Sequence, residues 1–211
     1  MDFESSRIFL LSPASCTGKR AGVLMREGAP FELARRFRNG GAPLGEVFSF
    51  LSGLYFRGKL EYAAAFARPP ARVAGIHVIT PSRGLVGPDT TLGLPDLREF
   101  ADVDINNDNP AYRTPLDRTA RALAAAIPES TTIVLLGSIA TGKYTDGLGA
   151  VFGERLQFPE EFAGRGDMSR GGLMLRCVDE ARELRYVPIA GAVRRGPRPP
   201  RLSPRRGRST R

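Results

Sequence analysis

Three short runs of apolar and β-branched residues set the main constraint on how this chain can fold. They are RIFLLS at 7–12, GIHVIT at 75–80 and TTIVLLG at 131–137. Runs of this length and composition indicate strands that are buried on both faces, as in a parallel sheet. Weaker strand patterns lie at 155–158 and 184–189.

Helical patterns lie between these runs. They cover residues 31–38, 45–56, 58–67, 115–127 and 170–181. The clearest of them places Pro115 near its first turn and has an apolar stripe that includes Leu116, Ala120 and Leu123. The alternation of strands and helices predicts an α/β fold, with a single domain whose mostly parallel central sheet is flanked by helices.

The basic charge of the chain is concentrated at its C-terminal end. Eight of the 31 basic residues lie at 191–211 together with no acidic residue, so residues 1–190 carry 23 basic groups against 22 acidic ones. The tail is rich in Pro, Gly and Arg, which predicts disorder. We therefore predict a domain at 1–190 and a disordered Arg/Pro-rich tail at 191–211. The tail either binds phosphate backbones through its charge or only keeps the chain soluble.

The cysteines and the apolar segments indicate a compartment. Cys16 and Cys177 are too few to suggest a disulfide framework or a zinc site. The first twelve residues begin acidic, unlike a secretory signal, and no apolar run approaches the roughly 18 residues of a membrane span. We expect a cytoplasmic protein without a membrane partner; the oligomeric state stays open.

Four polar loops carry the candidate binding residues. Three of them, at 12–20, 80–89 and 137–144, follow the three apolar strands named first, and the fourth, at 164–170, precedes the last helix. Open α/β sheets bind ligands beyond the carboxyl ends of their strands, so we expect the loops to meet around an anionic or base-like ligand. The expected ligand-binding residues are Ser12, Lys19, Arg57, Ser82, Arg83, Gly84, Ser138, Lys143, Arg165, Ser169 and Arg170.

Three residues are candidates for catalysis. Asp89 or Asp167 could serve as a general acid or base, while Cys16 lies close in sequence to Lys19 and Arg20, which would favour its thiolate. The alternative is that Asp167 only pairs with Arg170 or caps the last helix, which Ser169 could also cap. His77, the only histidine, lies inside a strand, where a structural role is favoured.

Two further patterns each have a simpler explanation. Residues 137–143, GSIATGK, have the spacing of a phosphate-binding loop, but Tyr144 follows where that motif needs Ser or Thr, so a plain glycine turn is the alternative. The acidic cluster Asp102, Asp104 and Asp108 lacks the spacing of a calcium loop and is explained as well by turns and helix caps. We expect no metal and no cofactor.

Four stretches occur in the same order as motifs of a known family. They are RIFLLSPAS, YFRGKLEYAAAF, HVITPSRGLVGPD and GRGDMSRGGLM. Through them the chain resembles the YaaA peroxide-stress family. The second and third stretches also resemble uncharacterised bacterial domains related to uracil-DNA-glycosylase-like folds and to a domain of archaeosine synthase. The matching positions are Ser12, Pro13, Phe56, Gly58, Gly84, Leu85, Pro88, Arg165, Gly166, Met168, Ser169 and Arg170.

The resemblance implies an α/β fold, association with DNA and a role in protecting DNA during oxidative stress. The chain departs from the family at two places. Lys59 stands where the family has Asp, and the tract after the first strand is shorter than the family's helix-hairpin-helix. These departures put the family's mode of duplex binding in question here, and the arginine tail would then be the source of phosphate contacts.

Two functions follow from these observations. The first is a nucleic-acid-associated stress protein with a pocket for a base or a phosphate, whose partner is DNA or a nucleotide-like anion. The second is an enzyme that acts on a nucleobase, a nucleotide or a related small molecule with the same loops.

Overall fold

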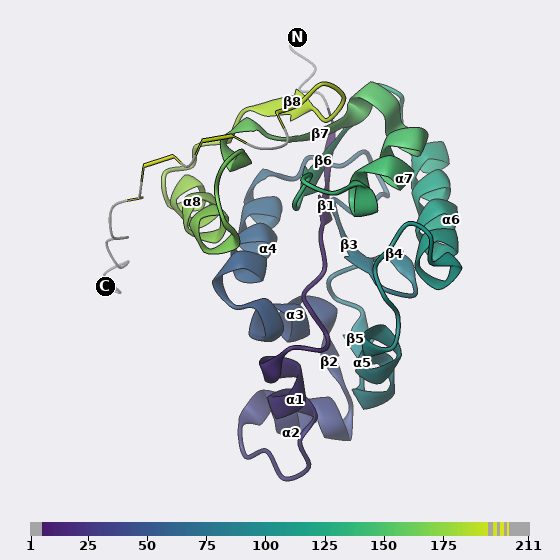
Figure 1. The fold of residues 1–211 in the computed structure, drawn as a ribbon, viewed down its shortest axis with the longest axis vertical. Helices are drawn as coiled ribbons and strands as arrows, with labels where there is room; N and C mark the ends of the chain where they lie inside the picture. The colour runs from purple at the N-terminus through teal and green to yellow at the C-terminus, as the bar shows by residue number, and fades with distance from the viewer. Residues whose placement is uncertain (1–5, 194–195, 198, 201, 203–211) are drawn as a thin grey trace.

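A computed structural model describes residues 6–193, 196–197, 199–200 and 202. Its centre is a six-stranded sheet with the strand order β4-β3-β1-β6-β7-β8 (Figure 1). The four inner strands run parallel, whereas the two edge strands run antiparallel to their neighbours. The strands are β1 (Arg7–Leu11), β3 (Ile76–Thr80), β4 (Gly84–Val86), β6 (Thr132–Leu136), β7 (Leu156–Pro159) and β8 (Tyr186–Pro188). The predicted α/β fold with a mostly parallel sheet is confirmed.

The central strands are buried on both faces. Residues 8–11 of β1 and 133–136 of β6 are fully buried, and the two strands pair in parallel along their whole length. Such strands bury apolar side chains alternately against the two helical layers, which explains their continuous apolar sequences. A separate two-stranded sheet joins β2 (Ala42–Pro43) and β5 (Thr91–Leu92).

Helices cover both sides of the sheet (Figure 1). In the figure, α4 and α8 lie side by side on one side, and α6 and α7 lie on the other. The helices α1, α2, α3 and α5 form the end of the molecule that lies beyond the carboxyl ends of the strands. The helices are α1 (Lys19–Met25), α2 (Glu32–Asn39), α3 (Leu44–Ser52), α4 (Leu54–Phe66), α5 (Leu94–Ala101), α6 (Pro110–Ala126), α7 (Gly142–Phe152) and α8 (Asp167–Asp179), with short 3-10 turns η1 (Gly153–Arg155) and η2 (Glu160–Phe162).

Two predicted helices differ from the observed ones at their ends. The helix expected from Pro115 begins earlier, because the Asn109 side chain accepts a hydrogen bond from the amide of Ala111 and Pro110 occupies the first turn. The helix expected over 45–56 is broken at Gly53, whose φ of 62° lies in the left-handed region. The break separates α3 from α4 and gives α4 its own direction.

The helices α4 and α8 touch at two glycines. A Cβ atom placed on Gly58 would lie 2.8 Å from the carbonyl oxygen of Gly171, and one on Gly171 would lie 2.7 Å from that of Leu54. Any larger residue would therefore push the two backbones apart. This close crossing brings the first turn of α8 next to Lys59 on α4.

Part of the expected tail is included in the structure. Leu202 is half-buried against the core, and Pro197 lies next to Gly164. Residues 194–195, 198, 201 and 203–211 lie outside the described residues, so the disorder predicted for 191–211 stays a prediction for them. None of the helices in the described part of the chain is long and apolar enough to cross a membrane.

Candidate functional site

A cavity of about 730 Å³ lies beyond the carboxyl ends of β1 and β6. Its wall is built from the loops that follow these strands, the first residue of α8, the junction of α3 with α4, and the segment from 100 to 105. The expected meeting of loops at this edge is therefore observed for all four, although the loop after β3 contributes only Pro81. The polar side chains of the wall belong to Ser12, Ser15, Thr17, Ser52, Tyr55, Asp102, Asp104, Ser138, Lys143, Tyr144 and Asp167.

Lys59 lies directly behind the cavity wall. Its side chain is 1% exposed, and its Nζ donates hydrogen bonds to the carbonyl oxygen of Ser12 at 2.5 Å and to Ser12 Oγ at 2.9 Å. Ser12 is also buried but lines the cavity, whereas Lys59 does not. Ser12 is thus the side chain that separates the lysine from the cavity.

The surroundings of Lys59 favour its neutral form. Burial lowers the pKa of the Lys59 amine from 10.5 to about 7, the nearby Asp167 carboxylate raises it, and the Arg170 guanidinium lowers it further. The rings of Tyr55 and Phe56 lie 4.5 and 4.8 Å from Nζ. Their π faces stabilise the charged form only in part. A lysine that is partly neutral near pH 7 can accept a proton, which an ordinary lysine does not do.

Tyr55 brings an unused hydrogen-bonding group to the same place. Its hydroxyl oxygen is buried and has no hydrogen-bond partner among the described residues. Burial raises the Tyr55 pKa to about 12, although Arg170 and Ser12 are near enough to lower it in part. The hydroxyl therefore keeps its proton at neutral pH, and its ring lines the cavity. A buried, unpaired donor is costly unless a ligand or water engages it.

Asp167 and Arg170 lie together at the start of α8. Asp167 Oδ1 is 3.9 Å from Arg170 Nη1, and the arginine also donates to the carbonyl oxygen of Phe162 at 3.1 and 3.2 Å. Arg170 is therefore held behind the site, while Asp167 is exposed and lines the cavity. The expected pairing of the two residues is observed together with the cavity position of Asp167.

The prediction that Ser169 caps α8 is wrong. The N-cap is Gly166, and Ser169 lies inside the first turn. Its Oγ accepts a hydrogen bond from Arg165 Nη1 at 3.2 Å, and Arg165 Nε donates to the carbonyl oxygen of Glu161. Neither Arg165 nor Ser169 lines the cavity.

The glycine turn at 137–143 leads from β6 into α7, as predicted. Ser138 and Lys143 line the cavity, and Ser138 Oγ accepts a hydrogen bond from the amide of Ala140 at 3.3 Å. The carboxylate of Asp146 lies against Gly142, at the start of α7, and accepts a hydrogen bond from Asn107. A carboxylate at that position opposes a phosphate at the helix N-terminus, which favours the plain glycine turn.

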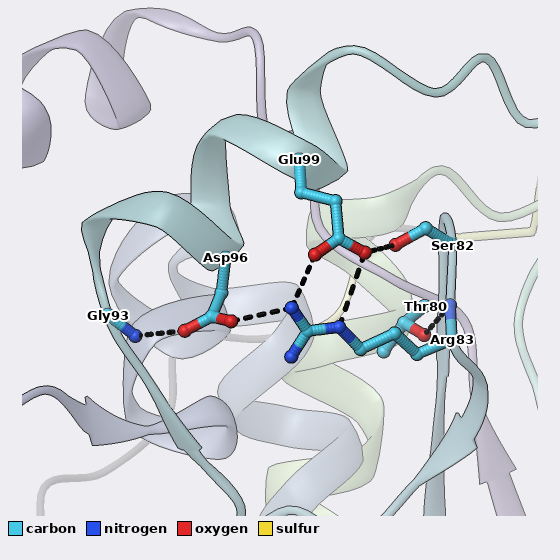
Figure 2. Close-up of polar contacts among 6 residues, drawn as sticks. All are labelled: Thr80, Ser82, Arg83, Gly93, Asp96 and Glu99. Atoms are coloured by element: carbon cyan, nitrogen blue, oxygen red, sulfur yellow. Dashed lines mark hydrogen bonds and ion pairs between the residues drawn. The ribbon is translucent and has the colours of Figure 1, made fainter.

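The loop at 80–89 lines the cavity only with Pro81, and Ser82, Arg83 and Gly84 make their contacts elsewhere. Figure 2 shows that Arg83 binds Asp96 and Glu99 of α5, and that Ser82 donates to Glu99. A hydrogen bond from the Gly93 amide, and then the Arg83 pairing, lowers the pKa of the Asp96 carboxyl, and the Arg83 pairing lowers that of Glu99. Gly84 packs its backbone against α6 at a φ of 69°. The expected anion contacts of Ser82, Arg83 and Gly84 are therefore replaced by contacts that join β4 to α5 and α6.

Three other expected residues do not reach the cavity. Arg57 is exposed and lies 3.7 Å from Glu61 on the next turn of α4. Lys19 is exposed at the start of α1, and Asp89 is exposed in the turn before β5. None of the three lines the cavity. None of the four arginines expected to bind the ligand (Arg57, Arg83, Arg165 and Arg170) therefore belongs to the described wall.

The expectation of a thiolate at Cys16 is wrong. Cys16 lines the cavity but is 5% exposed, and burial raises the pKa of its thiol to about 12. Its basic neighbours in sequence do not compensate, because Lys19 is exposed and Arg20 donates to the carbonyl oxygen of Phe50. A thiol of this kind is a poor nucleophile at neutral pH.

The sequence interpretation missed the two groups that define the site best, Tyr55 and Lys59. Their signal was present in the helical spacing of α4. Tyr55, Tyr62 and Phe66 recur on one buried stripe, and Lys59 falls in the middle of that stripe. A single cation on an otherwise apolar helix face indicates a buried charge with a special role.

Two of the three clustered aspartates contribute to the wall. Asp102 and Asp104 line the cavity, whereas Asp108 does not. Among the described residues, no group of three or more His, Cys, Asp or Glu side chains is arranged to hold a metal ion.

Comparison of the chain with protein-family models, with curated proteins and with solved structures found no match. The resemblance to the YaaA family therefore stays a prediction that depends on the four sequence motifs.

Proposed function

We propose that the cavity binds a nucleobase, a nucleoside or a related small molecule, and that the chain acts on this ligand. The observation that carries the proposal is the convergence of loops after β1 and β6 with the start of α8 around one hollow. Its volume of about 730 Å³ suits a ligand of that size. This edge of an open parallel sheet is also where such folds bind their ligands.

The charges of the wall favour an uncharged ring over a polyphosphate. Asp102, Asp104 and Asp167 are carboxylates, and Lys143 is the ammonium group in the described wall. Carboxylates accept hydrogen bonds from ring N–H groups and sugar hydroxyls, but they repel phosphate oxygens. Tyr55 and Tyr144 add aromatic side chains to the wall, which suits a planar ring.

A panel of ligands tests this proposal by calorimetry. Nucleobases and nucleosides are expected to bind, and the matching triphosphates are expected to bind at least about tenfold more weakly, since three carboxylates face the ligand. Asp167→Asn is expected to weaken binding of the best ligand by roughly tenfold, because it removes one charged acceptor.

The matched control is Asp89→Asn, the same change at an exposed position outside the cavity. It is expected to bind as the unmodified chain does. Equal affinity of Asp167→Asn and Asp89→Asn would contradict the assignment of the cavity. Binding of triphosphates in preference to nucleosides would contradict the charge argument.

A second function, association with nucleic acid, is favoured by one observation. Eight arginines without an acidic residue lie at 191–211. A segment of this composition binds phosphate backbones by releasing counterions. The resemblance to the YaaA family supports the same partner, and the two functions are compatible because the cavity and the tail are separate parts of the chain.

A further inference from the structure

We propose that Ser12, Lys59 and Tyr55 form an acyl-transfer centre, in which Ser12 is the nucleophile, Lys59 its base and Tyr55 the donor to the developing oxyanion. The proposal rests on the proposed function, since the substrate is then an ester or amide carried by the small molecule in the cavity. The three side chains come from two elements, the end of β1 and α4.

The relative positions of Ser12 and Lys59 assign their roles. Ser12 lines the cavity, and Lys59 lies behind it with Nζ 2.9 Å from Ser12 Oγ. A ligand in the cavity therefore meets the hydroxyl before the amine, which disfavours direct attack by the lysine. A nucleophile with a base at hydrogen-bond distance behind it is the arrangement that activates a hydroxyl group.

The second contact of Lys59 fixes the amine for this task. Nζ donates to the carbonyl oxygen of Ser12 at 2.5 Å, which uses one N–H group. In the neutral amine the lone pair can then point along the 2.9 Å line to Ser12 Oγ. The base is thus oriented by the backbone of the residue that it activates.

Tyr55 supplies the third group. Its hydroxyl oxygen is buried close to Arg170 and Ser12 but makes no hydrogen bond of ordinary geometry with the described residues, so its O–H group is not committed to another partner. Tyr55 lines the cavity, and after burial the Arg170 guanidinium has the largest influence on its hydroxyl, while Ser12 has a smaller one. A donor that has no partner before reaction and gains one as negative charge develops stabilises the transition state selectively.

The reaction balances with water as the second substrate. Lys59 Nζ takes the Ser12 hydroxyl proton as Oγ bonds to the carbonyl carbon, and the carbonyl π electrons move to the oxygen that Tyr55 contacts. When this tetrahedral intermediate collapses, the bond to the leaving alcohol or amine breaks, and the leaving group takes the proton from Lys59. Water then attacks the Ser12 ester and gives a proton to Lys59. Ser12 Oγ leaves and takes that proton back as the carboxylic acid is released.

The reaction should depend on the protonation of Lys59. Asp167 and Arg170 of α8 and Tyr55 of α4 are the titratable and charged groups that face this region. Burial, the largest influence, lowers the Lys59 pKa to about 7. The neutral base then predominates above that pH, so the acylation rate is expected to rise through neutral pH and level off.

The test uses p-nitrophenyl acetate with the full chain, and peptide mapping by mass spectrometry to locate the acetyl group. We expect acetylation of Ser12. Lys59→Met is expected to slow it by at least about 100-fold, and Lys59→Arg should not restore it, because a guanidinium stays protonated. Tyr55→Phe is expected to slow it by roughly 10- to 100-fold. Circular dichroism of each variant checks its fold.

Lys19→Met and Ser169→Ala are matched controls outside the cavity, and both should react like the unmodified chain. Acetylation of Ser12 at the same rate in Lys59→Met, or acetylation of another residue in place of Ser12, would overturn the proposal. If Lys59→Met does not fold, the pH profile of the unmodified chain decides, and a flat rate between about pH 5.5 and 8.5 would overturn it. If the unmodified chain binds nucleosides but Ser12 is not acetylated, only the acyl-transfer centre is refuted. If it neither binds nucleosides nor becomes acetylated, the assignment of the cavity is refuted as well.

Discussion

Burying the Lys59 amine costs the chain free energy of folding. An amine taken out of water loses its hydration, and two hydrogen bonds to Ser12 with two aromatic faces compensate only in part. The lowered pKa expresses this cost, because folding favours the neutral form. A buried amine of this kind beside a cavity is consistent with a role in proton transfer.

The cost predicts how stability depends on pH. The pKa of Lys59 is about 7 in the folded chain and about 10.5, its ordinary value, in the unfolded chain. The unfolded chain therefore binds more protons than the folded chain between these two pH values. Stability therefore rises as pH increases through this window, and the penalty is complete below it. Relative to Lys59→Met, the unmodified chain should gain about 1–2 kcal/mol of unfolding free energy between pH 7 and 8.5, measured by urea unfolding.

Lys19→Met is the matched control for this measurement, because Lys19 is exposed on the folded chain. Its stability difference from the unmodified chain is expected to stay level over the same range. A level difference for Lys59→Met as well would show that the amine is not held neutral by burial.

At this scale, sequence neighbours were a poor guide to the environment of a side chain. Cys16 has Lys19 and Arg20 within four positions, yet its thiol is surrounded by buried atoms and its pKa rises. Arg83 carries the charge expected of an anion ligand, but α5 supplies two carboxylates that only the folded chain brings to it. Both outcomes depend on side-chain directions, which sequence spacing does not specify.

At the scale of elements, strand and helix positions could be predicted where a long apolar pattern determined them. The strands β1, β3 and β6 follow directly from their buried sequences. The strand β4 has three residues, and its pairing depends on the turn at Gly84 and on α6, so no local pattern predicted it. Short elements are fixed by their partners and not by their own sequence.

The crossing of α4 and α8 gives a second prediction. Gly58→Ala should destabilise the chain by roughly 1–3 kcal/mol, because the new Cβ would meet the backbone of Gly171, which cannot rotate away as a side chain would. Chemical denaturation measures the change.

Gly149→Ala is the control at a helical position with open space around the added Cβ. It is expected to stabilise the chain by up to about 1 kcal/mol, since alanine favours a helix more than glycine does. Similar effects of the two substitutions would mean that the close helix crossing is not tight in solution.

At the scale of the whole molecule, the charge is divided between a nearly neutral domain and a basic tail. If the tail binds duplex DNA, affinity should fall steeply with salt, with a logarithmic slope of about −0.9 for each phosphate contacted. Replacing the eight arginines of 191–211 with glutamine should remove most of that slope. Fluorescence anisotropy with a labelled duplex measures it.

The control replaces the same arginines with lysine, which keeps the charge and should keep the slope. An unchanged slope in the glutamine variant would place DNA binding elsewhere on the chain, and no binding at about 50 mM salt would contradict DNA association altogether.

The location of the site could be predicted from the sequence, but its composition could not. The rule that ligands bind beyond the carboxyl ends of parallel strands placed Ser12, Ser138 and Asp167 correctly on one wall. Tyr55 and Lys59 enter from a helix that no rule about strand ends includes. Their position depends on the close contact of α4 with α8, which only the packed molecule reveals.

The two borders of the main sheet, β4 and β8, are each three residues long and run against their inner neighbours. Exposed borders are where a sheet recruits strands from other chains and begins to aggregate, and short borders offer few free backbone groups for that. The long, strongly apolar strands stay in the interior. The most apolar strands therefore lie where another copy of the chain cannot pair with them.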